Sequence, residues 1–350
     1  MWNQWYRNRA PMGGISKSRL HRSLQAGMQP TTMGGEMTIP ARMSRFGAIG
    51  LVLALTSACA SLDRSDSELA GIARLADRLT SELPADKRDA LLVAADAALK
   101  AERMEDAYAR YAEVLTYEPK NARAVVGLSE VYLATGDAQR ALVGFEQVGE
   151  TSALSAVARQ GQGLALARMG KFDLALKQLD LAVAKDPKLW RSWSARGYIH
   201  DLSGKWQAAD ESYRKALEIK SDSPVVHNNR GMSLLMRGRF AEAAAAFQQA
   251  LRLDPHLAAA RANMRLALAW QGRYLEAATG VHGPEAAATL NNIGFVAMKK
   301  GNYARAELYF TQAIKASPAH YDKAQRNLQY VRQLRSAQAG DETRALSPAN

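Results

Sequence analysis

Cys59 is the only cysteine of this 350-residue chain, and its surroundings predict a covalent modification. It follows a run of 13 apolar and small residues, Phe46 to Ala58, which itself follows the positively charged start Met43-Ser44-Arg45. The run is too short to cross a bilayer, since a membrane-spanning helix needs about 20 apolar residues. A positive start, a short apolar segment and small residues before a break are typical of a secretory signal. We therefore expect the chemistry of Cys59 to be nucleophilic attack by its thiolate during export.

The segment Leu55-Thr56-Ser57-Ala58-Cys59 resembles a bacterial lipobox. The resemblance implies cleavage after Ala58 and a covalent lipid on Cys59, although the leucine lies one residue further from the cysteine than is usual in that family. Several acyl chains give a stable anchor, because each buried CH₂ contributes about 0.8 kcal/mol. The alternative is an uncleaved apolar anchor with an incidental cysteine.

The segments around Cys59 follow from this interpretation. Residues 1–42 show no helical or alternating period, so we predict a disordered or non-native extension, with translation starting at Met43. Residues 43–58 are the predicted lipoprotein signal peptide, and the polar residues 59–68 are the predicted tether. Ala60, rather than aspartate, follows the cysteine, which by resemblance to enterobacterial lipoproteins implies the periplasmic face of the outer membrane.

No other set of residues predicts catalysis. Gly163, Gly170 and Lys171 resemble a phosphate-binding loop, but the glycines are too far apart and Phe172 stands where serine or threonine is needed. A single cysteine excludes an intramolecular disulfide and a cysteine-rich metal site. We therefore predict a protein that is not an enzyme, with no metal, no cofactor beyond the lipid on Cys59 and no small-molecule substrate.

The net charge of +12 is not evidence for nucleic-acid binding. Residues 1–58 hold seven Lys or Arg and one Glu, so they contribute +6, half of the total, within a segment that we expect to be absent from the mature protein. The remaining +6 is spread over about 290 residues without a run of one sign. We therefore predict no nucleic-acid partner.

Most of the chain repeats with a period of 34 residues. A small residue is followed four residues later by an aromatic residue or leucine, and a glycine lies five residues before most of these small residues. The small residue recurs at Ala107, Ala141, Ala175, Ala209, Ala243 and Ala277. Glycine marks the end of a first helix, because a left-handed residue there needs no Cβ. The period therefore predicts an all-α chain of helix pairs.

This pattern resembles the tetratricopeptide repeat over residues 88–320. The resemblance implies a right-handed superhelical solenoid of six 34-residue units and a last unit, in which the sixth unit, 258–286, lacks five residues and is cut short by Gly280, Gly283 and Pro284. The shortening is either a hinge or a tolerated deletion. Because terminal repeats expose an apolar face, we predict capping helices at 69–84 and 321–336, followed by a disordered tail at 337–350.

The same resemblance implies that the first helix of each unit lines a groove for a partner. In the last three units the groove positions are mainly apolar, which fits an amphipathic or extended segment of a partner protein. The predicted groove residues are Asn228, Met232, Leu235, Met236, Ala262, Leu266, Trp270, Asn291, Phe295 and Met298. The alternative is that some of them pack inside the solenoid. In the earlier units the groove positions include Arg123, Glu130, Gln160, Arg168, Arg191 and Asp201, which we interpret as a solvated wall of mixed charge.

The last unit, from Leu290 to Phe310 and on to Asn327-Leu328, resembles the Flp/Tad pilus assembly lipoproteins of the TadD family. That resemblance implies a membrane-anchored interaction scaffold that assists localisation or assembly of a secretin channel, as a pilotin does. The competing interpretation is a generic tetratricopeptide scaffold lipoprotein for envelope or outer-membrane protein assembly. An enzyme with an attached repeat domain is disfavoured, since residues 88–336 are taken up by repeats and a cap.

Overall fold

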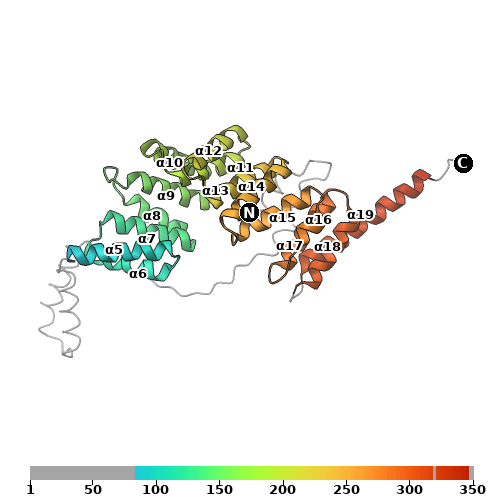
Figure 1. The fold of residues 1–350 in the computed structure, drawn as a ribbon, viewed down its shortest axis with the longest axis horizontal. Coiled ribbons are helices and arrows are strands. Elements are labelled where there is room, and N and C mark those ends of the chain that lie inside the picture. The colour runs from blue at the N-terminus through green and yellow to red at the C-terminus, as the bar shows by residue number, and fades with distance from the viewer. Residues whose placement is uncertain (1–82, 318–320, 347–350) are drawn as a thin grey trace, which may run out of the picture. The chain divides into compact units, whose positions relative to one another are not determined.

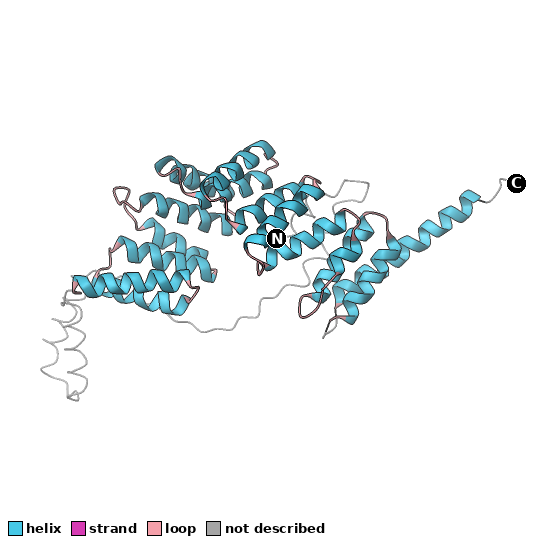
Figure 2. Ribbon diagram, in the orientation of Figure 1, coloured by secondary structure: helices cyan, strands magenta, loops and turns pink. Residues whose placement is uncertain are grey.

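The computed structural model describes residues 83–317 and 321–346, which form helices joined by short turns (Figure 2). The predicted segments 1–42, 43–58 and 59–68, with Cys59, lie outside the described residues, as does all but the end of the predicted capping helix 69–84. The helices are α5 (Ala85–Lys100), α6 (Met104–Tyr117), α7 (Ala122–Thr135), α8 (Ala138–Glu146), α9 (Ser155–Arg168), α10 (Phe172–Lys185), α11 (Trp190–Leu202), α12 (Trp206–Ile219), α13 (Pro224–Met236), α14 (Phe240–Leu253), α15 (Ala258–Trp270), α16 (Tyr274–Ala278), α17 (Ala286–Lys299), α18 (Tyr303–Lys315) and α19 (Asp322–Leu346).

The helices pack as consecutive pairs, one pair for each unit of the sequence (Figure 1). We call the first helix of a pair, from α5 to α17, helix A and the second, from α6 to α18, helix B. Each helix B also packs on the helix A that follows it, and successive helices A contact one another. Successive helices B are not in contact within the described residues. The stack therefore curves with the helices A on its inner side, which is the arrangement of a tetratricopeptide superhelix.

Local sequence explains where the helices begin and end. Gly170 and Gly238 end helices A with φ angles of 75° and 77°, in the left-handed region where a Cβ would be strained. Ser223 caps α13 by accepting a hydrogen bond from the backbone N–H of Val226, and Pro224 occupies the first helical position, where its missing N–H costs nothing.

The core between the helices of a pair is built from alanine, glycine and one large side chain. Phe247 of α14 is fully buried, and a Cβ placed on Gly231 of α13 would lie 2.6 Å from its ring. Gly197 and Gly294 lie equally close to Tyr213 and Phe310 in their own units. These glycines, each twelve residues before the repeated alanine, mark a small slot on helix A, against which the ring of helix B packs.

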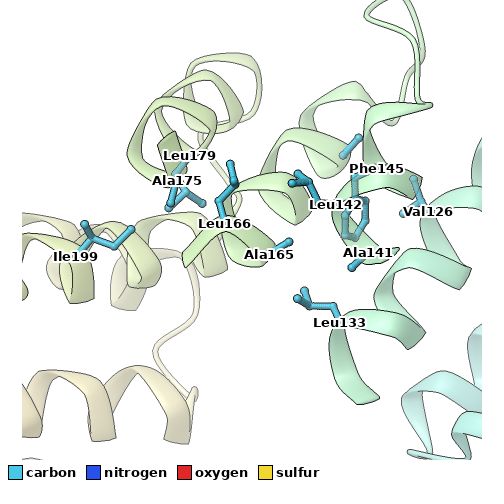
Figure 3. Close-up of a cluster of buried hydrophobic side chains, with 11 residues drawn as sticks. Val126, Leu133, Ala141, Leu142, Phe145, Ala165, Leu166, Ala175, Leu179 and Ile199 are labelled. Carbon is cyan, nitrogen blue, oxygen red and sulfur yellow. The ribbon is translucent and has the colours of Figure 1, made fainter. Parts of the chain in front are cut away.

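The same packing joins successive units into one core. Figure 3 shows Phe145 of α8 beside Ala141 and Leu142, with the side chains of α9 to α11 continuing the cluster. The ring of Phe145 also lies against Gly161 of the following unit, where a Cβ would meet it at 2.3 Å. A single aromatic side chain therefore holds its own pair together and anchors the next one.

The sixth unit departs from this plan in two ways that belong together. Its helix B, α16, ends at Ala278 and lacks the turn that carries the large side chain elsewhere. The slot that is glycine in α11, α13 and α17 holds Arg265. Nη1 of Arg265 donates hydrogen bonds to the backbone carbonyls of Ala277 and Thr279, both at 2.8 Å. The arginine therefore caps the shortened helix in the unit where no ring fills the slot.

Replacing Arg265 by alanine should destabilise the array by about 2–3 kcal/mol, because two charge-assisted hydrogen bonds to the end of α16 are lost. Arg252→Ala is the matched control, since this exposed arginine of α14 bonds only to the side chain of Gln249. Urea unfolding followed by circular dichroism measures both. Equal unfolding midpoints for the two variants would contradict a capping role for Arg265.

The C-terminal helix α19 begins close to the predicted start of the cap, and its fully buried Ala324 and Val331 lie on the side that packs against α18. It does not end at residue 336, however, but continues to Leu346. The prediction of a disordered tail from residue 337 is therefore wrong as far as Leu346. Residues 337–346 hold three alanines, and Gln338, Glu342, Arg344 and Leu346 also favour a helix, so together they outweigh the single Gly340.

Candidate partner-binding face

The predicted groove residues of α13 divide into two kinds. Met232 and Met236 are half-buried, so part of each side chain is open to solvent. Leu235 is 3% exposed and Asn228 is 9% exposed, so both belong to the packing between helices. Val225 on the same helix is 46% exposed. Val225 was absent from the predicted set, although it lies three residues before Asn228 and thus on the same face of the helix.

The residues of α15 divide in the same way. Ala262 is exposed and Leu266 is buried. Trp270 is half-buried, and its ring stacks on Phe240 of α14 with 5.3 Å between centroids and 7° between ring planes. The backbone carbonyl of Trp270 also accepts a hydrogen bond from Nζ of Lys300, at 2.8 Å. The indole is therefore held in one orientation with part of its surface accessible.

In α17 only Phe295 is accessible among the three predicted residues. Phe295 is half-buried, with the ammonium of Lys299 5.7 Å from its ring centroid. Asn291 is 1% exposed and Met298 is buried, so neither reaches a partner in this conformation. For Leu235, Leu266, Asn291 and Met298 the structure therefore favours the alternative interpretation, packing inside the solenoid.

The two predicted asparagines bind neighbouring helices rather than an open groove. Oδ1 of Asn228 accepts a hydrogen bond from Nδ2 of Asn263, at 3.0 Å, and Oδ1 of Asn291 accepts one from Nδ2 of Asn327, at 2.9 Å. Each bond joins a helix A to the next inner helix, α15 or α19. Since a buried amide must be paired, these bonds explain why asparagine occupies buried positions. The spacing of 35 and 36 residues was the sequence signal for them.

The accessible apolar residues at the groove positions of the last three helices A form what we call the candidate binding face. They come from three successive helices A, which contact one another in order. The face consists of Val225, Met232 and Met236 of α13, Ala262 and Trp270 of α15, and Phe295 of α17. Flexible methionines beside rigid aromatic rings give a surface that adapts to apolar side chains while keeping fixed anchor points.

The inner side of the earlier units is polar but already paired. Glu130 of α7 and Arg191 of α11 form a two-pronged ion pair, with N–O distances of 3.0 and 3.2 Å, although α9 lies between their helices in the chain. Arg123 pairs with Asp96, Gln160 accepts a hydrogen bond from Ser192, and Arg168 donates to the carbonyl of Leu133. Arg123 and Arg168 are exposed, as expected of a solvated wall of mixed charge, but the side chains at these positions also join successive helices.

Asp201 of α11 is the most buried charged group on that wall. Its carboxylate accepts hydrogen bonds from the hydroxyls of Tyr213, at 2.8 Å, and Ser233, at 2.6 Å. Arg237 donates to the same Ser233 hydroxyl while pairing with Asp210. Burial raises the pKa of Asp201 to about 6, against the opposing effect of the two hydrogen bonds. The network connects helices of the fourth and fifth units.

The raised pKa of Asp201 predicts a pH dependence of stability with a definite sign. The folded protein keeps this proton up to about pH 6, whereas the unfolded chain releases it near pH 4, so ionisation of Asp201 lowers the free energy of unfolding as pH rises between these values. Relative to the Asp201→Asn variant, the wild type should lose up to about 3 kcal/mol between pH 4 and pH 7.5. Urea unfolding of both proteins across this range measures the difference. Parallel pH profiles would contradict the shift.

Within the described residues, no helix is both long and apolar enough to span a bilayer. The same part of the chain contains no group of three or more His, Cys, Asp or Glu side chains placed to hold a metal ion.

Models of the tetratricopeptide repeat match residues 98–159, 161–224, 224–257 and 287–320. Together these matches cover more than half of the chain. The chain belongs to the tetratricopeptide repeat family. The matches omit residues 258–286, which is the unit with the shortened α16, so the family pattern weakens where the structure departs from it. The described part of this tetratricopeptide protein is thus a protein-interaction scaffold.

Single proteins match this chain over a short segment or at low sequence identity. The uncharacterized protein y4yS of Sinorhizobium fredii is 35% identical over 65 residues, which are 19% of this chain and 36% of y4yS. The matched segment therefore spans about a third of that protein's length. Similar solved structures share the repeat fold. A tetratricopeptide protein from Parabacteroides merdae is 17% identical, with a TM-score of 0.46, 70% of this chain covered and 98% of that chain.

Two further similar structures are the proteins PilW and PilF. PilW, a widely conserved type IV pilus biogenesis factor, is 25% identical, with a TM-score of 0.43, and the alignment covers 55% of this chain and 92% of PilW. PilF of Pseudomonas aeruginosa is 16% identical, with a TM-score of 0.43, and the alignment covers 68% of this chain and 95% of PilF.

Proposed function

We propose that this protein is a lipid-anchored periplasmic scaffold that helps a secretin channel to localise or assemble in the outer membrane during Flp/Tad-type pilus assembly. The observation that carries the proposal is the candidate binding face, which is an accessible apolar surface. The polar side chains on the inner side of the earlier units are largely paired within the chain. A face of this kind suits an apolar segment of a protein partner better than a small polar substrate.

Two features of the sequence support the proposed outer-membrane location and the proposed role in pilus assembly. The lipobox-like segment ending in Cys59 supports attachment by a lipid, and Ala60 supports delivery to the outer membrane. The resemblance of the last unit to the TadD family supports a role in pilus assembly. Without that resemblance the same features would fit a generic scaffold for envelope or outer-membrane protein assembly, which is the second candidate function.

Replacing Cys59 by serine should move the protein from the membrane pellet to the soluble fraction of a bacterial lysate, because the thiol that accepts the lipid is removed and a hydroxyl does not replace it. Ser57→Ala, two residues before the cysteine, is the matched control and should stay in the pellet. Immunoblotting of the separated inner and outer membranes measures both. Equal sedimentation of the Cys59→Ser variant and the wild-type protein would contradict a lipid anchor on Cys59.

The proposed partner is tested by affinity capture from detergent-solubilised outer membranes. The immobilised protein should retain the secretin of the same organism, identified by immunoblotting. Retention of the assembly machinery for other outer-membrane proteins, without the secretin, would favour the second candidate function and would overturn the proposed role in pilus assembly.

A further inference from the structure

Two arginines lie four residues apart on α15, beside the shortened helix of the sixth unit. Side chains at this spacing share one face of a helix, so Arg261 and Arg265 are neighbours. Arg265 is half-buried in the slot that holds glycine in α9, α11, α13 and α17, and Arg261 is exposed one turn earlier. Like charges at this spacing destabilise a helix unless something compensates them.

Neither arginine has a carboxylate partner among the described residues. Nη2 of Arg261 donates to the backbone carbonyl of Pro255 at 2.8 Å, and Nη1 of Arg265 donates to the carbonyls of Ala277 and Thr279. A guanidinium has five N–H donors, so most donors of the pair are not used by these bonds. The remaining nitrogens of Arg265 are not enclosed by protein, since none of them is a buried atom without a partner, and Arg261 is exposed.

Two other exposed arginines nearby each pair with a glutamate three residues later. Arg239 pairs with Glu242 on α14, and Arg273 pairs with Glu276 on α16. By contrast, α13, α15 and α17 contain no Asp or Glu over their whole lengths. The positive charge of Arg261 and Arg265 is therefore left without a balancing carboxylate on their own helix or on either neighbouring helix A.

The pKa of Arg265 reflects this lack of a balancing carboxylate. Burial lowers the pKa of its guanidinium, and the nearby charge of Arg261 lowers that pKa further. A bound anion would reverse both effects, because it would replace lost solvation and would attract both charges at once. Arginine donates paired N–H bonds to an oxyanion, so the donors that two neighbouring arginines leave unused suit such a group.

We propose that Arg261 and Arg265 form an oxyanion-binding site on the sixth unit, which takes a carboxylate or phosphate group. The site is distinct from the candidate binding face and does not rest on the proposed role in pilus assembly. The shortened α16 is part of the site. Because helix B lacks its later turns, the side chain of Arg265 occupies the slot on α15 and reaches the carbonyls at the end of α16. The deviation from the repeat pattern is thus a functional feature of the unit.

The test is a titration of the purified chain at low salt with two probes, followed by isothermal titration calorimetry. Inorganic phosphate represents a phosphate source, and a hexaglutamate peptide represents the carboxylates of an acidic protein segment. At least one probe should bind, and the tighter one identifies the source of the anion. Arg261→Gln should weaken that binding at least tenfold, whereas Arg252→Gln on α14 should leave it unchanged.

Arg261→Gln is the informative variant because its side chain is exposed, so the array should keep its wild-type circular dichroism. Arg265→Lys is the second variant. It keeps one positive charge but loses the planar fork, so it should bind the probe more weakly than the wild type while remaining folded. No binding of either probe to the wild type, or equal affinities of the wild type and Arg261→Gln, would overturn the site.

Discussion

Replacing Trp270 and Met236 together by alanine should weaken capture of the partner by about 100-fold. Trp270 is the largest side chain of the candidate binding face, and stacking on Phe240 fixes its orientation, so little entropy is lost when a partner packs against it. Buried tryptophans at interfaces commonly contribute 2 kcal/mol or more, and a methionine contact adds about 1 kcal/mol. A total of about 3 kcal/mol corresponds to the expected loss in affinity.

This prediction needs a control for folding and a control for surface apolarity. Leu275→Ala serves for the second, because Leu275 is 77% exposed on α16, a helix B, and has no place on the candidate binding face. Circular dichroism and the unfolding midpoint serve for the first, since loss of the Phe240 stack alone should cost only about 1 kcal/mol. Binding of detergent-solubilised secretin to each immobilised variant measures the effect. Undiminished binding by a folded double variant would remove the candidate binding face from the proposed function.

The helix pairs could be predicted from the sequence because their signal is repeated. The same spacing recurs in other units for Ala243, Phe247 and Gly238. Each helix assignment is therefore supported by several units that pack in the same way. The shortened unit was visible for the same reason, since a break in a regular pattern is easy to locate. The end of α19 was not, because no repeat follows and residues 337–346 are polar enough to fit either a helix or a tail.

The site could be predicted only in part. A groove position names the side of a helix, but it does not say whether the neighbouring helix covers that side. Asn291 and Leu235 occupy such positions and are nevertheless buried, and Asn291 is bonded to Asn327 of α19. Pairs such as Glu130 with Arg191 join units that are not adjacent in the chain, and they depend on the curvature of the stack. No spacing rule within one unit contains that information.

Truncating Phe247 to alanine should destabilise the array by about 3–5 kcal/mol, the usual cost of removing a buried ring from a close-packed core. The ring packs against Gly231, so nothing on α13 can move in to fill the space without a change of backbone. The opposite change, Gly231→Val, should be comparably severe, because even a Cβ at that position would lie 2.6 Å from the ring. Urea unfolding followed by circular dichroism measures both variants.

The decisive measurement is the double variant Gly231→Val with Phe247→Ala. The sixth unit already combines a large side chain in the glycine slot, Arg265, with a helix B that brings no ring against it. If the slot and the ring compete for the same space, the double variant should be more stable than the sum of the two single losses predicts, by at least about 1 kcal/mol. Strict additivity would mean that the glycine is required for its backbone rather than for the space that it leaves. Gly238→Ala is the reference for a purely conformational effect. Gly238 has a φ of 77° and no close neighbour, so this variant should lower the free energy of unfolding by about 1 kcal/mol through backbone strain alone.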